Sequence, residues 1–554
     1  MQISLSTLLG SVMDGRWSLT LGVVVVCTSG RLGAQAGVFY RLETIGSDAD
    51  DRARLAQLLG DRRTDGYLLR SPSSVTPALS DSADRNRFHW AGVVPQLVAI
   101  GNSSLPFSLN DGALWAGRGW SESLRAGFRV ERGRLSLTLA PELLTSENIL
   151  YELAAPEVTL GRPQGRNPLS SPWHVQPYSI DLPQRFGYLP IWRLDPGQST
   201  FAVDAGWVTV GVATESEWWG PGVHNAIVLS NNAPGIPRLF LRTTRPIPTR
   251  IGTIEARWFV GALSESGYFD SDPTNNLRSI AGLGLAWGVK WAPGLTLGMA
   301  RTVYAPVRKW SGVPLRMFDV FLNFGLSDAD PADTAHGRDQ VYSIFGRWVL
   351  PQDRLEVYFE WARTAFPSSV RDLFIAPNRT RGYTVGLEWA KPVRDEHATL
   401  RIGAEVTSLE KNSAYRDRPV ATFYTSRHVA QGYTQRGQVI GAAIGPGASS
   451  QWLRVDYFVP RWRVGVFGGR IRWDDDALYT FPNDYDAKWC SHDVSLFAGV
   501  SAAGSGRWGS AKLSLTRGER LNVFFHHLTG CDPAPSLGVV DARNTTLELR
   551  LSPP

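Results

Sequence analysis

The residues best suited to recognition chemistry lie in one short segment, 215–241. Its adjacent tryptophans, Trp218 and Trp219, run into Gly220-Pro221-Gly222, and an asparagine-rich stretch follows. Aromatic faces pack against the C–H surfaces of sugars, while planar amides and charged groups bind hydroxyl and acidic groups. The side chains with this chemistry are Trp218, Trp219, His224, Asn231, Asn232 and Arg238. The segment therefore predicts a polysaccharide-binding site.

The same segment also fits an architectural role. Gly220, Pro221 and Gly222 are typical of a rigid, sharply turning loop, and the side chains of Asn231 and Asn232 could bind backbone groups in turns. The sequence leaves both interpretations open: these residues contact a ligand, or they form the scaffold of a loop.

Enzymatic and metal chemistry have little support. His224 and Ser230 could form a base–nucleophile pair, but neither a Gly-x-Ser-x-Gly motif nor a clear orienting carboxylate accompanies them. The aspartates at 474–476, with Asp484 and Asp486, could supply oxygen ligands to Ca²⁺, but they match no EF-hand spacing and favour a solvated loop. We therefore expect no catalytic activity, no cofactor and no bound metal.

The composition excludes several classes of protein. Of 554 residues, 43% are hydrophobic, 11% aromatic and only 19% charged, against roughly 25% charged in an average soluble protein. Such a chain is too apolar to be disordered. Its mean hydropathy is −0.15, and no apolar run of about 18 residues follows Ala36, which excludes a helical membrane protein. A large soluble all-β protein or a transmembrane β-barrel remains.

The net charge of +6 is spread along the chain. It forms no patch suited to nucleic acid, but it is compatible with an acidic polymer as partner.

The N-terminus predicts export. Residues 17–27 form an apolar core behind Arg16, and Ala34-Gln35-Ala36 is a small-residue cleavage pattern, so 1–36 is predicted to be a signal peptide. Met13 is an alternative start. Export would place the mature chain in an oxidising compartment.

One helix is predicted directly after the signal peptide, at 47–59. Ser47 can cap its first turn, and Gly60 can end it. Asp50 and Asp51 lie in the first turn, where negative side chains interact favourably with the helix dipole. A Ser/Pro-rich stretch, 71–80, follows. We therefore assign 37–86 to a small helical segment with a connector.

From about Arg87 onward the apolar residues recur with a period of two. The segments 355–361, 383–389, 400–406 and 453–459 each have one apolar face and one polar or small face. This alternation is typical of β-strands. A secreted β-sandwich or propeller would also alternate, but the glutamates and arginines of the polar face fit a water-filled lumen better than a second core.

Turn lengths favour the barrel. Short turns are predicted at 351–354, 391–397, 460–461 and 503–506, and longer polar loops at 325–338 and 474–489. Short turns on one side and long loops on the other are typical of outer-membrane barrels. Tryptophans near strand ends suit interfacial girdles. They are Trp348, Trp361, Trp389, Trp452 and Trp462.

Two cysteines, Cys490 and Cys531, remain after signal cleavage and suit one disulfide. The alternation at 513–525 fits either one long strand or a hairpin. One strand places both cysteines in loops on the same side of the barrel, whereas a hairpin separates them. We expect one strand, because the last strand, 544–551, would then run back to a periplasmic C-terminus.

The Trp-Trp-Gly-Pro-Gly block followed by Ser-Asn-Asn-Ala resembles the Wzi family of bacterial capsule assembly proteins. Further matching pieces are found from about residue 40 to the C-terminus. They are 111–115 with 117–119, 141–143, 180–187, 197–199, 492–494 and 520–522.

The resemblance implies an all-β fold, a transmembrane antiparallel barrel of about 18 strands, with the helical segment on its periplasmic side. Residues 87–554 would then form the barrel. It also implies a lectin-like monomer in the bacterial outer membrane, in contact with its lipid, that holds capsular or other acidic polysaccharide at the surface without chemistry. A general porin or channel is the alternative, because the sequence does not decide whether the lumen is open.

Overall fold

The computed structural model describes residues 39–79, 86–154, 167–175, 177–322, 337–366, 369–393, 397–412, 421–480, 491–526 and 541–554. None of the helices within these ranges has the length and apolarity needed to span a bilayer. The predicted signal peptide (1–36), Cys490 and Cys531 lie outside these ranges, so cleavage and the disulfide stay predictions.

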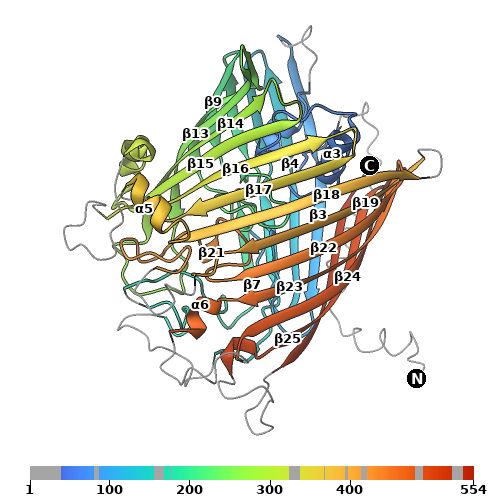
Figure 1. Ribbon diagram of the computed structural model, residues 1–554. Helices are drawn as coiled ribbons and strands as arrows, with labels where there is room; N and C mark the ends of the chain where they lie inside the picture. The colour runs from blue at the N-terminus through green and yellow to red at the C-terminus, as the bar shows by residue number, and fades with distance from the viewer. Residues whose placement is uncertain are drawn as a thin grey trace, which may run out of the picture.

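One large sheet forms the body of the molecule and closes on itself (Figure 1). Its closing pair joins β3 (Phe88–Asn102) to β26 (Ala542–Ser552) in antiparallel register. The other strands of the wall follow in chain order. They are β4 (Gly119–Arg132), β5 (Leu135–Leu139), β6 (Glu142–Ser146), β7 (Ile191–Asp195), β8 (Thr200–Asp204), β9 (Val208–Ala213), β11 (Arg238–Thr243), β12 (Ile247–Thr249), β13 (Gly252–Ser264), β14 (Leu277–Val289), β15 (Leu295–Pro306), β16 (Asp339–Leu350), β17 (Leu355–Arg363), β18 (Arg381–Val393), β19 (Ala398–Ser408), β22 (Ser449–Phe458), β23 (Trp462–Trp473), β24 (Asp493–Gly506) and β25 (Gly509–Leu521).

Three positions in the wall are interrupted. β5 and β6 both pair with β4, β7 and β8 continue one another, and β12 extends β11 along β13. With each of these pairs counted as one strand, the sheet is a closed antiparallel barrel of 18 strands. The predicted fold class and strand number are confirmed.

The two ends of the barrel differ. Short turns such as 290–294 and 351–354 lie at one end, where β3 begins and β26 finishes, and we call it the short-turn end. The opposite, long-loop end carries connections such as 147–190 and 409–448. In outer-membrane barrels the short turns are periplasmic. The turn predicted at 503–506 is wrong by a few residues, because β24 continues to Gly506.

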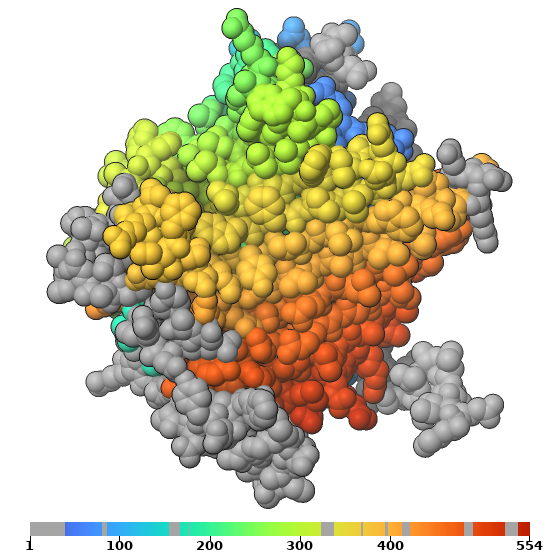
Figure 2. Space-filling model, viewed as in Figure 1, coloured from blue at the N-terminus to red at the C-terminus, as the bar shows by residue number. Residues whose placement is uncertain are grey.

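The alternating pattern separates the outside of the wall from the lumen. In β17, Val357 and Phe359 are 40% and 42% exposed, whereas Glu356 and Glu360 are fully buried. The four strands predicted from this pattern are confirmed as β17, β18, β19 and β22, and the outer surface over β16 to β24 is a continuous wall (Figure 2). The girdle prediction is wrong for Trp452, because Leu453 takes the outward position of β22 and turns Trp452 into the lumen.

The segment predicted as one strand at 513–525 is confirmed as far as Leu521, where β25 ends. Asn522 has a φ of 50°, which breaks the extended backbone, and the 3₁₀ turn η7 (Val523–Phe525) replaces the rest of the predicted strand. β26 then runs back to the short-turn end, as expected.

The predicted N-terminal helix is confirmed as α3 (Asp48–Leu59). Ser47 Oγ accepts a hydrogen bond from the Asp50 amide (3.3 Å), and Gly60 ends the helix with a φ of 86°. The apolar side of α3 packs against the inner wall at the short-turn end, so the helix lies within the barrel rather than beside it (Figure 1). β1 (Phe39–Tyr40) lies parallel to β3, and α4 (Pro72–Val75) follows β2 (Leu69–Arg70).

Candidate functional site

Two long connections fold back into the barrel from the long-loop end. We call them inner loop A (residues 214–237) and inner loop B (residues 421–448). Ile227 of inner loop A and Tyr424 of inner loop B are fully buried, and both pack in one apolar cluster with wall residues such as Phe345. The expectation of a water-filled lumen is therefore wrong for this part of the barrel: packed protein occupies it.

Hydrogen bonds fasten the two inner loops to each other. Tyr424 Oη donates to the Ile227 carbonyl (2.7 Å) and accepts from the Ala442 amide (2.8 Å). Tyr433 Oη donates to the Val228 carbonyl (2.7 Å). Because these phenols are buried, each satisfied oxygen ties one loop to a fixed position on the other.

The two tryptophans of the recognition segment face the interior. Trp218 and Trp219 form β10 (Trp218–Trp219), which pairs with β2 of the N-terminal segment. Their side chains are 3% and 0% exposed. Trp218 Nε1 donates to the Gly222 carbonyl (3.1 Å), which holds the turn closed.

The Gly220-Pro221-Gly222 turn binds helix α3. Gly220 has a φ of 110°, which a side chain would strain. The Pro221 carbonyl accepts a hydrogen bond from Arg54 Nη1 of α3 (2.9 Å). The turn thus joins inner loop A to the helix from the opposite end of the barrel.

Arg238 is 5% exposed and is part of a buried ion-pair group. Its Nη2 atom lies 2.8 Å from Glu217 Oε1, and Arg257 Nη1 lies 2.9 Å from Glu217 Oε2. Burial alone would raise the pKa of Glu217, but Arg257 and Arg238 outweigh it and lower that pKa. Arg238 therefore serves as a counter-ion within the protein.

The Ser-Asn-Asn-Ala block meets a second motif of the sequence, 111–115. The Gly112 amide donates to the Asn231 carbonyl (2.7 Å), and the Asn110 amide donates to Asn232 Oδ1 (3.2 Å). Asn232 Nδ2 donates to the Val439 carbonyl of inner loop B (2.9 Å). Asn231 Nδ2 donates to the Ile45 carbonyl (3.1 Å), so this block bonds the backbone of three other segments.

The hydrolase alternative lacks its geometry. Ser230 Oγ donates to the Gly441 carbonyl (2.5 Å) and accepts from the Asn232 amide (3.1 Å). Within the described ranges no hydrogen bond joins Ser230 to His224. The His224 ring lies instead flat on Trp452, with 4.1 Å between ring centroids and 9° between planes.

The aspartates at 474–476 are buried, so the solvated loop expected there is wrong for these three residues. Asp484 and Asp486 lie outside the described ranges. The three buried aspartates lie at and within α6 (Asp475–Leu478). His174 Nε2 lies 2.6 Å from Asp474 Oδ2, and His492 bonds Asp475. Asp476 accepts from the Lys411 amide (2.9 Å), and burial raises the pKa of Asp476 to about 7. These contacts hold the long-loop end together.

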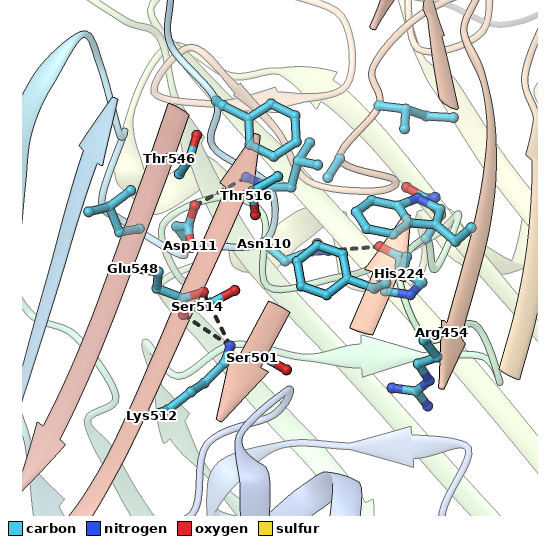
Figure 3. A pocket seen from close by; sticks show the side chains of 18 of the residues that line it. Asn110, Asp111, His224, Arg454, Ser501, Lys512, Ser514, Thr516, Thr546 and Glu548 are labelled. Atoms are coloured by element: carbon cyan, nitrogen blue, oxygen red, sulfur yellow. Dashed lines mark hydrogen bonds and ion pairs between the residues drawn. The ribbon is translucent and has the colours of Figure 1, made fainter. Parts of the chain in front are cut away.

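A cavity of about 240 Å³ opens between inner loop A, the 107–111 segment and the wall from β22 to β26 (Figure 3). It is lined by hydroxyl groups, two amides, both signs of charge and the Trp452 ring. The labelled residues are Asn110, Asp111, His224, Arg454, Ser501, Lys512, Ser514, Thr516, Thr546 and Glu548. A second cavity of about 250 Å³ shares several of these residues and extends to α3.

The charges of the cavity are balanced. Lys512 Nζ lies 3.1 Å from Glu548 Oε1, and Arg550 Nη2 lies 3.4 Å from Asp111 Oδ1. Burial lowers the pKa of His224 to about 3, with Arg454 adding to the effect, so its imidazole is neutral. Burial raises the pKa of Asp111 to about 6. The cavity thus presents many hydrogen-bonding groups and little net charge, which suits a hydroxyl-rich ligand.

Sequence reasoning on the recognition segment found His224 but missed the wall residues of this cavity. Arg454, Lys512, Ser514 and Thr516 stand at the polar positions of strands whose alternation was evident. The pattern identified them as lumen-facing, but it did not indicate which of them line a cavity with His224.

Comparison with known proteins assigns this chain to a family. The family model described as "Capsule assembly protein Wzi" matches residues 117–466. This chain belongs to the Wzi family of capsule assembly proteins. Membership and the 18-strand barrel place it in the bacterial outer membrane, as predicted. No curated protein matches the sequence.

Among solved structures, Wzi of Escherichia coli matches with a TM-score of 0.51 and 10% identity, over 82% of this chain and 83% of that one. That protein is described as a carbohydrate-binding β-barrel involved in group 1 capsule assembly. OccAB2 of Acinetobacter baumannii (TM-score 0.39, 10% identity, 83% and 97% covered) and OccK2 of Pseudomonas aeruginosa (0.36, 12%, 83% and 96%) are less similar. At 10% identity, the likeness to Wzi of Escherichia coli shows the fold.

Proposed function

We propose that this Wzi-family barrel binds capsular or other acidic polysaccharide and helps to attach or assemble capsule at the cell surface. It acts as a monomer in contact with outer-membrane lipid, and it carries out no catalysis. The family match over 117–466 carries the proposal, and Wzi of Escherichia coli is described as a carbohydrate-binding barrel.

The interior of the barrel supports binding rather than conduction. Helix α3 and the two inner loops occupy the lumen, and their contacts are buried and hydrogen-bonded. The remaining cavity has the chemistry that sugars need, because hydroxyls, two amides and an aromatic ring lie within one lining. We assign one sugar unit of the polysaccharide to this cavity.

The candidate residues divide into two roles under this proposal. Trp218, Trp219 and Arg238, with Asn231 and Asn232, hold inner loop A in place, because their contacts are with the protein's own backbone and ion pairs. His224 lines the cavity together with Ser514 and Thr516, so it is the candidate that contacts the ligand.

Polysaccharide binding by the purified barrel tests the proposal. Acidic capsular polysaccharides and glycan arrays should give saturable binding to the wild type. The cavity variant Ser514→Val/Thr516→Val should weaken binding without lowering thermal stability. Trp218→Ala, Trp219→Ala and Arg238→Ala should lower stability first and binding as a consequence. Absence of binding to every acidic polysaccharide by a correctly folded barrel would contradict the proposal.

Single-channel conductance separates the proposal from the porin alternative. A lumen occupied by α3 and two inner loops should give no large, stable ionic current in planar bilayers. A large and stable current through the wild-type barrel would favour the porin instead.

A further inference from the structure

An apolar groove of about 680 Å³ runs along the outer face of the barrel. Its floor is the outward side of β5, β8, β9, β11 and β13, where Phe201, Val212 and Leu239 are 42%, 45% and 42% exposed. Trp310, Val313 and Pro314 form its wall on the side of the long loops. We call this feature the lateral groove. Its volume lies in the range of ligand-binding pockets.

The wall of the groove is an overhang built from η2 (Trp310–Gly312), η3 (Pro314–Arg316) and η4 (Asp319–Phe321). Val313 packs on Val260, which points outward from β13, and Trp258 Nε1 donates to the Met317 carbonyl (3.0 Å). The segment therefore folds onto the outside of the barrel, and Figure 1 shows it in yellow-green beside α5 (Val370–Ile375), away from the lumen.

The groove follows a line where the wall is interrupted. Pro141 and Pro196 stand at the breaks between β5 and β6 and between β7 and β8, and both line the groove. Above them the hairpin of β20 (Thr434–Gln435) and β21 (Gln438–Val439) reaches the wall from within. The Arg436 amide donates to the Ser264 carbonyl of β13 (2.9 Å), and Arg436 Nη1 lies 2.7 Å from Asp195 of β7.

A basic pair directly precedes Trp310 of the groove wall. The side chains of Arg308, Lys309 and Trp310 are all exposed, and neither cation forms an ion pair within the described ranges. They follow β15 at the long-loop end, which faces the outer leaflet. Exposed cations beside an interfacial tryptophan suit a phosphate headgroup.

We propose that the lateral groove binds one outer-leaflet lipid, with an acyl chain on the apolar floor and its phosphate on Arg308 and Lys309. The ligand class is an acylated, phosphate-bearing glycolipid. Because the groove lies on the outer face of the barrel, this site is separate from the polysaccharide cavity in the lumen and does not rest on its function. The overhang separates the bound acyl chain from the bulk lipid, so we expect the bound lipid to exchange slowly.

Retention of lipid by the full-length barrel tests the site. The purified protein is incubated in detergent with bisphosphorylated, hexa-acylated lipid A, washed, and analysed by native mass spectrometry. The wild type should retain one copy. Arg308→Glu/Lys309→Glu should lower retention at least about tenfold, because two attractive charges become repulsive. Phe201→Ala/Leu239→Ala should also lower retention by removing the floor.

The short-turn end offers a matched control, since Lys290 and Trp291 repeat the exposed Lys–Trp pair of 309–310 there. Lys290→Glu/Trp291→Ala should retain lipid A as the wild type does. Dephosphorylated lipid A should bind the wild type as weakly as lipid A binds the charge-reversed variant. Phosphatidylcholine vesicles test for nonspecific uptake, and uptake of phosphatidylcholine equal to that of lipid A would contradict the proposal.

Equal retention by all variants with heat-resistant, folded barrels would overturn the proposal. Equal retention of lipid A and dephosphorylated lipid A by the wild type would overturn it as well. A third result would also overturn the proposal: the wild-type barrel binds no lipid A but forms dimers, and Trp310→Ala dissociates them. The groove would then be a protein interface.

Discussion

Arg401 of β19 binds Asp51 of α3 through two parallel bonds, Nη1 to Oδ1 at 2.6 Å and Nη2 to Oδ2 at 2.8 Å. The same guanidinium reaches Asp456 of β22 at 2.6 Å. Burial would raise the pKa of Asp51, but Arg401 and Arg454 outweigh it and hold that pKa well below its ordinary range. The helix inside the barrel is thus fixed to the wall by charge as well as by apolar packing.

Removing one partner of this pair should destabilise the protein strongly. Asp51→Ala leaves the fully buried Arg401 without its main counter-ion, so the free energy of unfolding should fall by about 3–5 kcal/mol. Urea unfolding followed by gel mobility of the folded barrel measures it. Arg63→Ala breaks a pair whose arginine is 83% exposed and should cost about 0–1 kcal/mol. An equal loss of unfolding free energy in both variants would contradict the role of Asp51 as a buried counter-ion of Arg401.

The link between the inner loops can be tested at one oxygen. Tyr424→Phe removes the hydroxyl that bonds Ile227 and Ala442, and we expect a loss of about 1–3 kcal/mol in unfolding free energy because two buried backbone groups lose a partner. Protease cleavage within 421–448 should accelerate in parallel. Tyr188→Phe is the control, since Tyr188 is 63% exposed. Unchanged cleavage in the Tyr424 variant would show that the loops are held elsewhere.

The two ends of inner loop A pass each other closely at Gly235. A Cβ atom there would lie 1.6 Å from the Thr214 carbonyl oxygen, which belongs to the backbone. Gly235→Ala should therefore force the loop to shift and destabilise the protein by about 1–3 kcal/mol or more. Gly506→Ala, where nothing lies within 4 Å, should leave the thermal unfolding temperature unchanged. A stable Gly235→Ala barrel would mean that the loop moves freely.

The pH dependence of stability should contain a contribution from His224. Its pKa is lowered by burial from 6.5 to about 3 in the folded protein. Below pH 6.5 the unfolded chain binds a proton that the folded chain does not, so this contribution to stability falls as the pH decreases from about 6.5 to 3. His224→Gln removes it. The urea midpoint should therefore change less between pH 7 and pH 4 in the variant, and an identical pH dependence would exclude this role.

Local patterns predicted the elements well. The period of two at 355–361 is written in neighbouring residues, because successive side chains of a strand point to opposite faces. The Ser47 cap and the Gly60 stop likewise marked helix α3. The error at 522–525 arose because alternation continued in the sequence past Asn522, where the backbone turns.

The candidate site was only partly predictable. Residue chemistry identified Trp218 and Arg238 as suited to a ligand, but a buried ion pair or a backbone hydrogen bond uses the same atoms. Their partners, such as Glu217 and the Gly222 carbonyl, become evident only when the loop is folded. The resemblance to the Wzi family supplied the functional class, and the family match confirmed it.

The sequence by itself determined the apolar face and the polar face of the strands and the short capped helix. Only the tertiary structure decided what the interior face meets. Arg401 and Asp51 are 350 positions apart, and a polar strand face has the same sequence whether it lines water or binds a helix. The physical reason is that the period of two fixes the side toward which a residue points, whereas long-range ion pairs and inward-folded loops fix what stands there.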